Sequence, residues 1–523
     1  MEHQVRGLFG KNRVCAVVAA STRTEAAREV AASLRATRTI ELRLDWVGGR
    51  KEIRAALRWL AANNSAFRRS GVTIIATCRR RKAGGKFAGT IREQIAILRE
   101  AAEAGCRWLD LEIESAERFS RAELAAPRAK ARLLISDHNF RKMPQRLERV
   151  KGRLERARGD AIKIAAHAGT YGDACRLLDF ARTSRRSVMV PMGNLAAAAR
   201  ILALRCGSAV AYAPVNAATA PGQIGLSAMK EIYRAGKIDR HTSVYGVIGD
   251  PVAHSLSPQM QNAGFAARRM NAVYVPFLVR RGSRGLRDFL GAVEGLGVKG
   301  FSVTIPHKEA ILEYLDDCDP LAAEIGAVNT VVVRGGGKLY GYNTDYVGVL
   351  RALERRVQLA GSCVLILGAG GAARATAFAL AHAGANVRIC ARRPERARAL
   401  ARAVGGEAIE RSRLRAEYFD AIVNATPVGM HPNTKASPLE ANELNCRLVF
   451  DSIYRPRRTK LLQTAERRGI ETVSGVEMFI AQGAAQWEIW TGERAPESAM
   501  RQALEKALRR PENDSGSEDD RRS

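Results

Sequence analysis

Short apolar runs recur through the first half of the chain, and segments whose apolar residues follow a helical spacing separate them. EIRAALRWLAANN and TIREQIAILREAAEAG are two of these helical segments. The apolar runs have the length of buried β-strands and cover residues 14–20, 39–45, 72–79, 108–113, 131–138, 161–167, 187–192 and 210–215. Eight strands that alternate with helices predict a closed (β/α)₈ TIM barrel over residues 1–234, with a last helix near 225–234.

The strand–helix pattern starts again after a polar connector, AGKIDRHTS at 235–243. A glycine-containing run, VVVRGGGKLYGYN, predicts a β-hairpin at 331–343 between two further α/β portions. The second half is therefore expected to be a two-part α/β module, followed by a disordered tail that lacks apolar side chains. The expected boundaries are 243–345 for a substrate domain completed by 476–508, 346–475 for a Rossmann domain, and 510–523 for the tail.

The charge balance is strongly basic, with 84 Lys and Arg against 53 Asp and Glu and a formal net charge of +31. Such a balance can indicate nucleic acid, an anionic membrane or small anionic substrates as partners. The arginines are spread over helical segments instead of forming one basic arm, and aromatic residues make up only 6%. Stacking platforms for bases are therefore scarce, and we expect small-molecule substrates and no nucleic-acid partner.

Nine cysteines are spread singly along the chain without a CxxC pair. This distribution predicts neither a disulfide framework nor a zinc site, and it fits a reducing compartment. The apolar stretch LAAAARILALRC is interrupted by Arg200 and Arg205, so no membrane span is expected. The run VCAVVAA is too short for the core of a signal peptide. We therefore expect a soluble, cytoplasmic protein without a metal.

One charged residue interrupts the apolar run GDAIKIAAHA at 159–168. Burying an ammonium group is costly unless other groups compensate for it. Because side chains alternate along a strand, Lys163 faces the opposite way from Ile162 and Ile164, and in a barrel it points inward. Other strands carry polar residues near the same end, namely Glu41, Arg43, Asp45, Arg79, Asp110, Glu112 and His138. A buried structural ion pair could explain Lys163 alone, but it would not explain ionisable groups on several strands. These groups together indicate an active site at the carboxyl ends of the barrel strands.

These residue types suit the activation of a keto acid. A lysine amine can attack a ketone and form a Schiff base. A nearby histidine can transfer protons near neutral pH. Arginine side chains can bind a substrate carboxylate through two parallel hydrogen bonds.

The motifs ELRLD, TCR, DLE, SDHNF, IKIA, PMG and APGQIG, in this order and spacing, resemble type I 3-dehydroquinate dehydratase over nearly all of residues 10–234. The resemblance implies that Lys163 forms an imine with the C3 ketone of 3-dehydroquinate. It implies that His138 abstracts the C2 proton and assists imine formation and hydrolysis, so that water leaves to give 3-dehydroshikimate. The implied substrate-binding residues are Glu41, Arg43, Arg79, Arg200, Thr219 and Gln223. Thr219 stands where the family has a serine.

One position departs from that family. A glutamate usually precedes two glycines after the third-strand arginine, and it helps to position the histidine; here Ala83 precedes Gly84 and Gly85. We therefore expect a less well oriented His138 and a slow dehydratase. Asp110, on the neighbouring fourth strand, is a candidate to supply part of the missing role.

In the second half, SCVLILGAGGAARATAFALAHAG reads as a strand, a glycine turn and a helix. Gly368 permits a tight turn, while Gly370 and Gly371 let the backbone approach a pyrophosphate at the helix N-terminus. An NAD site would place an acidic residue after the next strand. This chain has Arg392, Arg393 and Arg396 there, which suits the 2′-phosphate of NADP.

The segments GDPVAHSLSPQMQN, FSVTIPHK, AVNT, GYNTD, NATPVGM, DSIYRPRRT and GVEMFIAQGAAQWEIWTG closely resemble shikimate dehydrogenase over residues 243–495. The resemblance implies that Lys308 and Asp345 are the acid–base pair beside the C3 oxygen, and that they supply a proton while NADPH transfers a hydride to the carbonyl. The implied substrate-binding residues are Ser255, Ser257, Thr304, Asn329, Tyr454 and Gln482. The cofactor set is Gly368, Ala369, Gly370, Gly371, Ala372, Arg392, Arg393, Arg396, Asn424, Thr426 and Gly475.

Two positions depart from this second family. Ser302 replaces a common asparagine, and Ala391 with Arg393 replaces parts of an Asn-Arg-Thr cofactor loop, which leaves the choice of cofactor open. Together the resemblances imply consecutive steps of the shikimate pathway in one chain. One alternative is an oxidative quinate/shikimate dehydrogenase that uses NAD. A second is a basic scaffold or nucleic-acid-binding protein on a decayed barrel, which would bind DNA with a steep salt dependence.

Overall fold

The computed structural model describes residues 8–9, 13–120, 123–124, 128–184, 186–216 and 222–509. Within these residues the chain forms three main sheets. It divides into two compact units, one made of Met1–Tyr245 and Asn271–Val298, the other of Gly246–Met270 and Lys299–Ser523.

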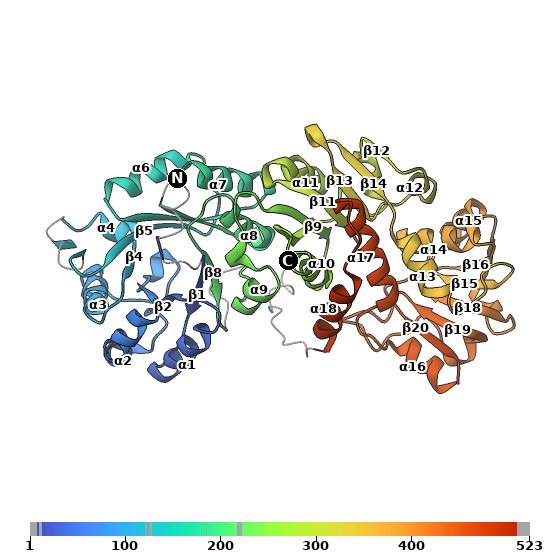
Figure 1. Ribbon diagram of the computed structural model, residues 1–523, viewed down its shortest axis with the longest axis horizontal. Coiled ribbons are helices and arrows are strands. Elements are labelled where there is room, and N and C mark those ends of the chain that lie inside the picture. Colours follow the sequence, from blue (N-terminus) through green and yellow to red (C-terminus); the bar gives the residue numbers. More distant parts are fainter. Residues whose placement is uncertain are drawn as a thin grey trace. The chain divides into compact units, whose positions relative to one another are not determined.

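The first sheet is a near-closed barrel of eight parallel strands, in the order β7-β6-β5-β4-β3-β2-β1-β8 (Figure 1, blue to green). The eight strands predicted from the apolar runs are confirmed: β1 (Val14–Val18), β2 (Thr39–Arg43), β3 (Thr73–Thr77), β4 (Trp108–Glu112), β5 (Arg132–Asn139), β6 (Ala161–His167), β7 (Ser187–Met192) and β8 (Ala211–Pro214). The helices of this part are α1 (Arg23–Ser33), α2 (Gly49–Arg69), α3 (Ile91–Glu103), α4 (Ile113–Ala116), α6 (Leu147–Arg156), α7 (Tyr171–Thr183), α8 (Ala197–Arg205) and α9 (Leu226–Glu231). The last of them is the helix expected near 225–234.

Strand pairing fixes which side chains share the barrel interior. In the parallel ladder Ser136 on β5 lies opposite Lys163 on β6, and Val17 on β1 lies opposite Glu41 on β2. The lower interior is an apolar cluster that includes Cys15, Val17, Ile75, Trp108, Leu134, Val188 and Tyr212. The apolar cluster thus fills the barrel below the polar residues at the carboxyl ends of the strands.

The second sheet has the order β10-β9-β11-β13-β14-β12. Its strands are β9 (Ser243–Gly249), β10 (Ala272–Leu278), β11 (Val298–Val303), β12 (Asp317–Cys318), β13 (Thr330–Val333) and β14 (Leu339–Tyr342). The helices of this part are α10 (Ser257–Ala267), α11 (Ser283–Leu296), α12 (Pro320–Ile325), α13 (Asp345–Leu353), α17 (Val476–Thr491) and α18 (Glu497–Arg509). Strands β13 and β14 pair antiparallel, which confirms the predicted hairpin.

The third sheet is parallel, in the order β17-β16-β15-β18-β19-β20. Its strands are β15 (Cys363–Leu367), β16 (Asn386–Cys390), β17 (Glu407–Ala408), β18 (Phe419–Asn424), β19 (Cys446–Asp451) and β20 (Glu471–Ser474), with α14 (Gly371–His382), α15 (Pro394–Ala403) and α16 (Lys460–Arg467) as helices. Along β15, Val364 and Ile366 pack into one apolar cluster, while Leu365 and Leu367 pack into another. A strand buried on both faces explains the unbroken apolar run CVLIL. The strand order reverses at β15 and β18, where nucleotide folds bind their ligands.

Candidate active sites

Lys163 lies inside the barrel with only 5% of its surface exposed. Its Nζ is 3.0 Å from Asp110 Oδ2 and 3.7 Å from Glu41 Oε1. On another side the ammonium lies over the ring of Tyr212, 3.9 Å from the centroid. The cost of burying this ammonium is therefore offset by two carboxylates and one aromatic face.

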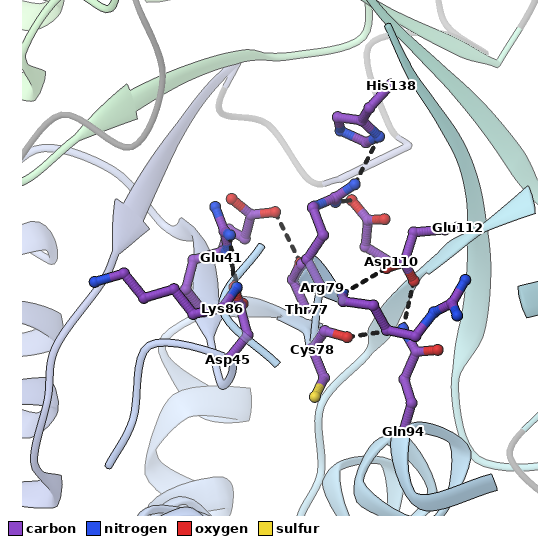
Figure 2. A network of polar contacts seen from close by, with 12 residues as sticks. Glu41, Asp45, Thr77, Cys78, Arg79, Lys86, Gln94, Asp110, Glu112 and His138 are labelled. Carbon is purple, nitrogen blue, oxygen red and sulfur yellow. Dashed lines mark hydrogen bonds and ion pairs between the residues drawn. The ribbon is translucent and has the colours of Figure 1, made fainter. Parts of the chain in front are cut away.

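Asp110 connects several of these groups. Its side chain accepts hydrogen bonds from Ser136 Oγ at 2.6 Å, from Arg79 Nη2 at 3.0 Å and from Lys163 Nζ at 3.0 Å. Burial alone would raise the pKa of Asp110, but the adjacent Arg79 and Lys163 cations hold it well below its usual range. Figure 2 shows the carboxylate lying beside the Arg79 guanidinium. Asp110 is therefore a buried anion that forms ion pairs with both Arg79 and Lys163.

His138 ends the chain of contacts that starts at Lys163. Its Nδ1 is 2.6 Å from Arg79 Nη1 (Figure 2). A guanidinium only donates, so Nδ1 accepts and the neutral ring carries its proton on Nε2. Burial and the Arg79 and Lys163 charges lower the pKa of His138 well below its ordinary value. The resting histidine is therefore neutral near pH 7.

Position 83 carries no carboxylate, and the charged group that contacts His138 Nδ1 is the guanidinium of Arg79. Ala83 ends a short 3₁₀ turn, Arg81–Ala83, after β3. The cation Arg79 contacts His138 Nδ1, and Asp110 contacts Arg79. Within the described residues, Arg79 therefore links Asp110 to His138.

The remaining side chains predicted for the barrel surround this group. Glu41 accepts from Thr77 Oγ1 at 2.7 Å, and Arg43 donates to both oxygens of Asp45. Burial lowers the pKa of Arg200 to about 10. One pocket is lined by Glu41, Arg43, Arg79, His138, Lys163, Arg200, Tyr212 and Gln223, among others. Thr219 lies outside the described residues.

A second pocket contains the Lys308–Asp345 pair. Lys308 Nζ is 2.5 Å from Asp345 Oδ2, and Asn329 Nδ2 donates to Asp345 Oδ1 at 2.8 Å. Asn329 Oδ1 in turn accepts from the Thr344 backbone N–H at 2.8 Å, so the residue before β13 and the start of α13 are tied together. The carboxylate is therefore held on one oxygen by an amide and on the other by the lysine.

This second pocket has a volume of about 300 Å³. Its lining includes all of the substrate-binding residues predicted for the second half, namely Ser255, Ser257, Thr304, Asn329, Tyr454 and Gln482. The ring of Tyr454 packs on Phe479 with centroids 4.1 Å apart. Desolvation raises the pKa of Tyr454. Ser302, which departs from the family pattern, donates to Gln486 Oε1 at 2.7 Å.

The glycine turn after β15 has the form that a pyrophosphate needs. Gly368 has a φ of +112°, and a Cβ there would lie 3.1 Å from Thr426 Cγ2. A Cβ on Gly370 would meet no atom within 4 Å, so the backbone at the start of α14 is open to a ligand. A Cβ on Gly371 would lie 3.0 Å from Lys308 Cβ. Ala369 and Ala372, the small residues of the turn, keep side-chain bulk away from it.

Two groups at neighbouring strand ends complete this fit to a dinucleotide. The exposed residues Arg392, Arg393 and Arg396 follow β16, whose last residue Cys390 accepts from the Gly368 N–H at 2.8 Å. These guanidinium groups therefore lie next to the glycine turn and offer charges for a 2′-phosphate. A Cβ on Gly475 would lie 2.3 Å from Ser452 O, so only glycine fits that wall of the second pocket.

Asn424 and Thr426 belong to a hydrogen-bonded loop that the sequence only partly reveals. Asn424 Oδ1 accepts from Thr426 N and Oγ1, and its Nδ2 donates to the buried Asp451 at 3.0 Å. Asp451 also accepts from Thr459 Oγ1 at 2.6 Å and from Ile453 N at 3.1 Å. Burial raises the pKa of Asp451 to about 6. Asp451 thus fixes the loop that lines the cofactor side of the pocket.

The described residues predicted for each site come together in its own pocket or turn. Sequence reasoning missed Tyr212 and Ser136 in the barrel and Asp451 in the second half. Tyr212 lies within the apolar run VAYAPV and reads as a core residue. Its signal in the sequence was its position on the eighth strand. Side chains from alternate strands share one level of a barrel interior, and β2, β4 and β6 supply Glu41, Asp110 and Lys163 to the level that β8 completes.

Among the described residues, no helix is long and apolar enough to cross a membrane. In the same part of the chain, no three His, Cys, Asp or Glu side chains come together in a way that suits a metal ion.

Four family models match parts of the chain. Residues 14–240 match type I 3-dehydroquinase, and residues 247–331 match the shikimate dehydrogenase substrate binding domain. Residues 475–505 match the shikimate 5′-dehydrogenase C-terminal domain. Residues 363–452, which include the glycine turn, match the model for NADP oxidoreductase, coenzyme F420-dependent.

Individual relatives cover either the whole chain or its second half. The chain is 35% identical to the bifunctional 3-dehydroquinate dehydratase/shikimate dehydrogenase, chloroplastic, of Arabidopsis thaliana, over 94% of this chain and 84% of the relative. It is 46% identical to the shikimate dehydrogenase (NADP(+)) of Methanothermobacter thermautotrophicus, over 51% of this chain and 98% of the relative. A solved structure of shikimate dehydrogenase in complex with NADP⁺ is 39% identical, with a TM-score of 0.49, over 52% of this chain and 97% of that one.

Proposed function

Because the chain belongs to the family of bifunctional 3-dehydroquinate dehydratase/shikimate dehydrogenases, we propose that it dehydrates 3-dehydroquinate and then reduces the 3-dehydroshikimate formed to shikimate. The observation that carries the proposal is the buried Lys163, held by Asp110 and Glu41 in a pocket that also contains His138. A nucleophilic lysine beside a neutral histidine suits imine chemistry on a ketone. The Lys308–Asp345 pair in the second pocket suits proton transfer to a carbonyl oxygen.

In the barrel, the ammonium group of Lys163 and the C3 carbonyl are proposed to condense, so that the carbonyl oxygen leaves as water with two of the ammonium protons and a protonated imine remains. His138 is proposed to remove the C2 proton with Nδ1, which requires the hydrogen bond that Nδ1 accepts from Arg79 to be given up first. Glu41, Arg43, Arg79, Arg200, Thr219 and Gln223 are the proposed substrate-binding residues. Arg200, a buried residue that lines the pocket, offers a charge for the substrate carboxylate.

In the second pocket, Ser255 and Ser257 are proposed to bind the carboxylate of 3-dehydroshikimate, while Thr304, Asn329 and Gln482 bind its hydroxyl groups. Lys308 is proposed to give a proton to the C3 oxygen, with Asp345 holding the ammonium in place. Bound NADPH supplies the hydride. The glycine turn after β15 suits its pyrophosphate, and Arg392, Arg393 and Arg396 suit its 2′-phosphate.

The boundaries of the parts also belong to the proposal. The dehydratase takes residues 1–234, and the dehydrogenase takes 243–345 with 476–508 for its substrate domain and 346–475 for its cofactor domain. A cytoplasmic location stays a prediction from the unpaired cysteines, and the plant relative is described as chloroplastic.

The deciding experiment follows NADPH absorbance with 3-dehydroquinate as the only other substrate. We expect consumption by the unaltered chain and none by Lys163→Ala, with full consumption restored when 3-dehydroshikimate is added to that variant. Lys151→Ala, at a half-exposed lysine on α6, is the matched control and is expected to behave as the unaltered chain. Reduction of 3-dehydroshikimate without any consumption from 3-dehydroquinate would refute the dehydratase half of the proposal. Faster oxidation of quinate with NAD than of shikimate with NADP would refute the reductive assignment.

A further inference from the structure

Four residues from alternate strands form one level inside the barrel. Glu41 lies on β2, Asp110 on β4, Lys163 on β6 and Tyr212 on β8. Lys163 Nζ lies 3.7 Å from Glu41 Oε1, 3.0 Å from Asp110 Oδ2 and 3.9 Å from the Tyr212 ring centroid. In barrels of this kind the side chains of one level come from alternate strands and are mostly bulky and apolar. Here three of the four are charged, and the fourth is aromatic.

The environment of Tyr212 shows which part of the side chain is used. The residue is 6% exposed, and it packs with Cys15, Val17 and Val188 in the apolar cluster below. Its buried hydroxyl has no hydrogen-bond partner among the described residues. A phenylalanine would fill the same space without an unpaired hydroxyl. The feature with a partner is therefore the ring face, and that partner is the nitrogen of Lys163.

The face of an aromatic ring carries negative electrostatic potential and attracts a cation, most strongly when water is excluded. The ammonium has three N–H donors, of which one is donated to Asp110 at 3.0 Å, while Glu41 at 3.7 Å forms an ion pair with it. Imine formation changes that count: the ammonium and the ketone give a protonated imine and water, and the nitrogen keeps one N–H and its positive charge. The two carboxylates then have a single N–H donor between them, whereas attraction to a ring face needs the positive charge of the nitrogen and no N–H donor.

We propose that the ring of Tyr212 is a further catalytic group of the barrel, which holds the reacting nitrogen of Lys163 and stabilises the positive charge of the protonated imine. This inference rests on the proposed dehydratase function. It assigns the ring an electrostatic role in turnover beyond its packing in the core. The hydroxyl has no part in that role.

The test is a series of variants at position 212 in the full-length chain. Tyr212→Phe keeps the ring face, and we expect its dehydratase kcat to stay within about twofold of the unaltered value. Tyr212→Leu removes the face, and we expect a loss of about two- to thirty-fold in kcat with a small change in KM. Replacement of Tyr212 by phenylalanines with one, two and three ring fluorines keeps the shape of the ring and weakens its negative face. We expect log kcat to fall stepwise along that series.

Two readouts separate this role from packing. Borohydride reduction in the presence of 3-dehydroquinate, followed by mass analysis of the peptide that contains Lys163, measures imine formation. Reduction of 3-dehydroshikimate by the second half of the same chain is expected to stay unchanged in every variant, which verifies the concentration of active second half against which the dehydratase rate is normalised, while the circular dichroism of each variant verifies that its barrel is folded. A fluorinated series with equal kcat values, or a Tyr212→Leu variant as fast as the unaltered chain, would overturn the role of the ring while leaving the dehydratase assignment intact. Absence of any reduced adduct in the unaltered chain would overturn the dehydratase assignment and this inference with it.

Discussion

Replacing Asp110 by asparagine keeps the shape of the side chain and removes its charge. Asp110 Oδ2 lies 3.0 Å from both Arg79 Nη2 and Lys163 Nζ, and the side chains of all three residues are almost fully buried. At an effective dielectric constant of about 20, each attraction is worth about 5 kcal/mol before desolvation is subtracted. Removing one partner from a buried charge cluster costs about 3–5 kcal/mol, because the remaining cations stay buried without compensation. We expect Asp110→Asn to lower the local stability of the barrel by that amount.

Native-state hydrogen exchange, read on peptides from β4, β5 and β6, measures this loss in the barrel separately from the rest of the chain. Glu117→Gln is the matched control, since its ion pair with Arg153 is largely exposed and is expected to contribute less than about 1 kcal/mol. The pKa of Asp110 is lowered in the folded state, so its contribution is complete above its unfolded pKa and is lost as pH falls below it. The difference between the variant and the unaltered chain should therefore shrink below about pH 4. A loss under 1 kcal/mol at pH 7, or one equal to that of Glu117→Gln, would refute this account of the charge cluster.

Two further predictions concern the second half. Arg393→Ser removes one charge proposed to bind the 2′-phosphate. We expect the KM for NADPH to rise about tenfold or more, while the KM for NADH stays unchanged. Equal changes in KM for the two cofactors would contradict this assignment. The pKa of Asp451 is raised to about 6, so the folded state binds the extra proton between about pH 4 and 6, and stability falls as pH rises through that window. Asp451→Asn keeps an oxygen that can accept from Asn424 and an N–H that can donate to Thr459. We expect its free energy of unfolding, measured by urea denaturation, to be about 3 kcal/mol higher than that of the unaltered chain at pH 8 and no higher at pH 4. An equal gain at both pH values would show that its charge is not the cause.

The strands of the barrel were predictable because each is a short apolar run bounded by polar residues. Alternation along β6 also predicted that Lys163 points inward, away from Ile162 and Ile164. The grouping of Glu41, Asp110 and Lys163 at one end of the barrel followed from the expectation that the carboxyl ends of parallel strands lie together, whereas their ion pairs were not predicted. These inferences need only the local pattern and the general geometry of the barrel.

Contacts that depend on the relative positions of several strands were not predictable. The Arg79–His138 hydrogen bond joins the segment after β3 to the end of β5, and Asp110 lies on β4 between them. The sequence suggested that His138 lacks its usual carboxylate at position 83 and offered Asp110 as a partial replacement, but it could not identify a cation as the neighbour of Nδ1. In the same way, Asp451 ends an apolar strand and its partner Thr459 caps a helix several residues later, so neither residue type alone signals their contact.

The close approach of Gly371 to Lys308 limits how the reductase can change over generations of mutation. A methyl group at position 371 would press on the Cβ of Lys308, the lysine proposed to deliver the proton. A substitution in the nucleotide turn would therefore displace this lysine and lower the rate of the reduction. Selection for a different cofactor is therefore directed away from this turn, toward the exposed arginines after β16, which can be exchanged without disturbing Lys308. A laboratory evolution experiment toward NADH should accumulate its first substitutions at positions 392, 393 and 396 and leave glycine at 371.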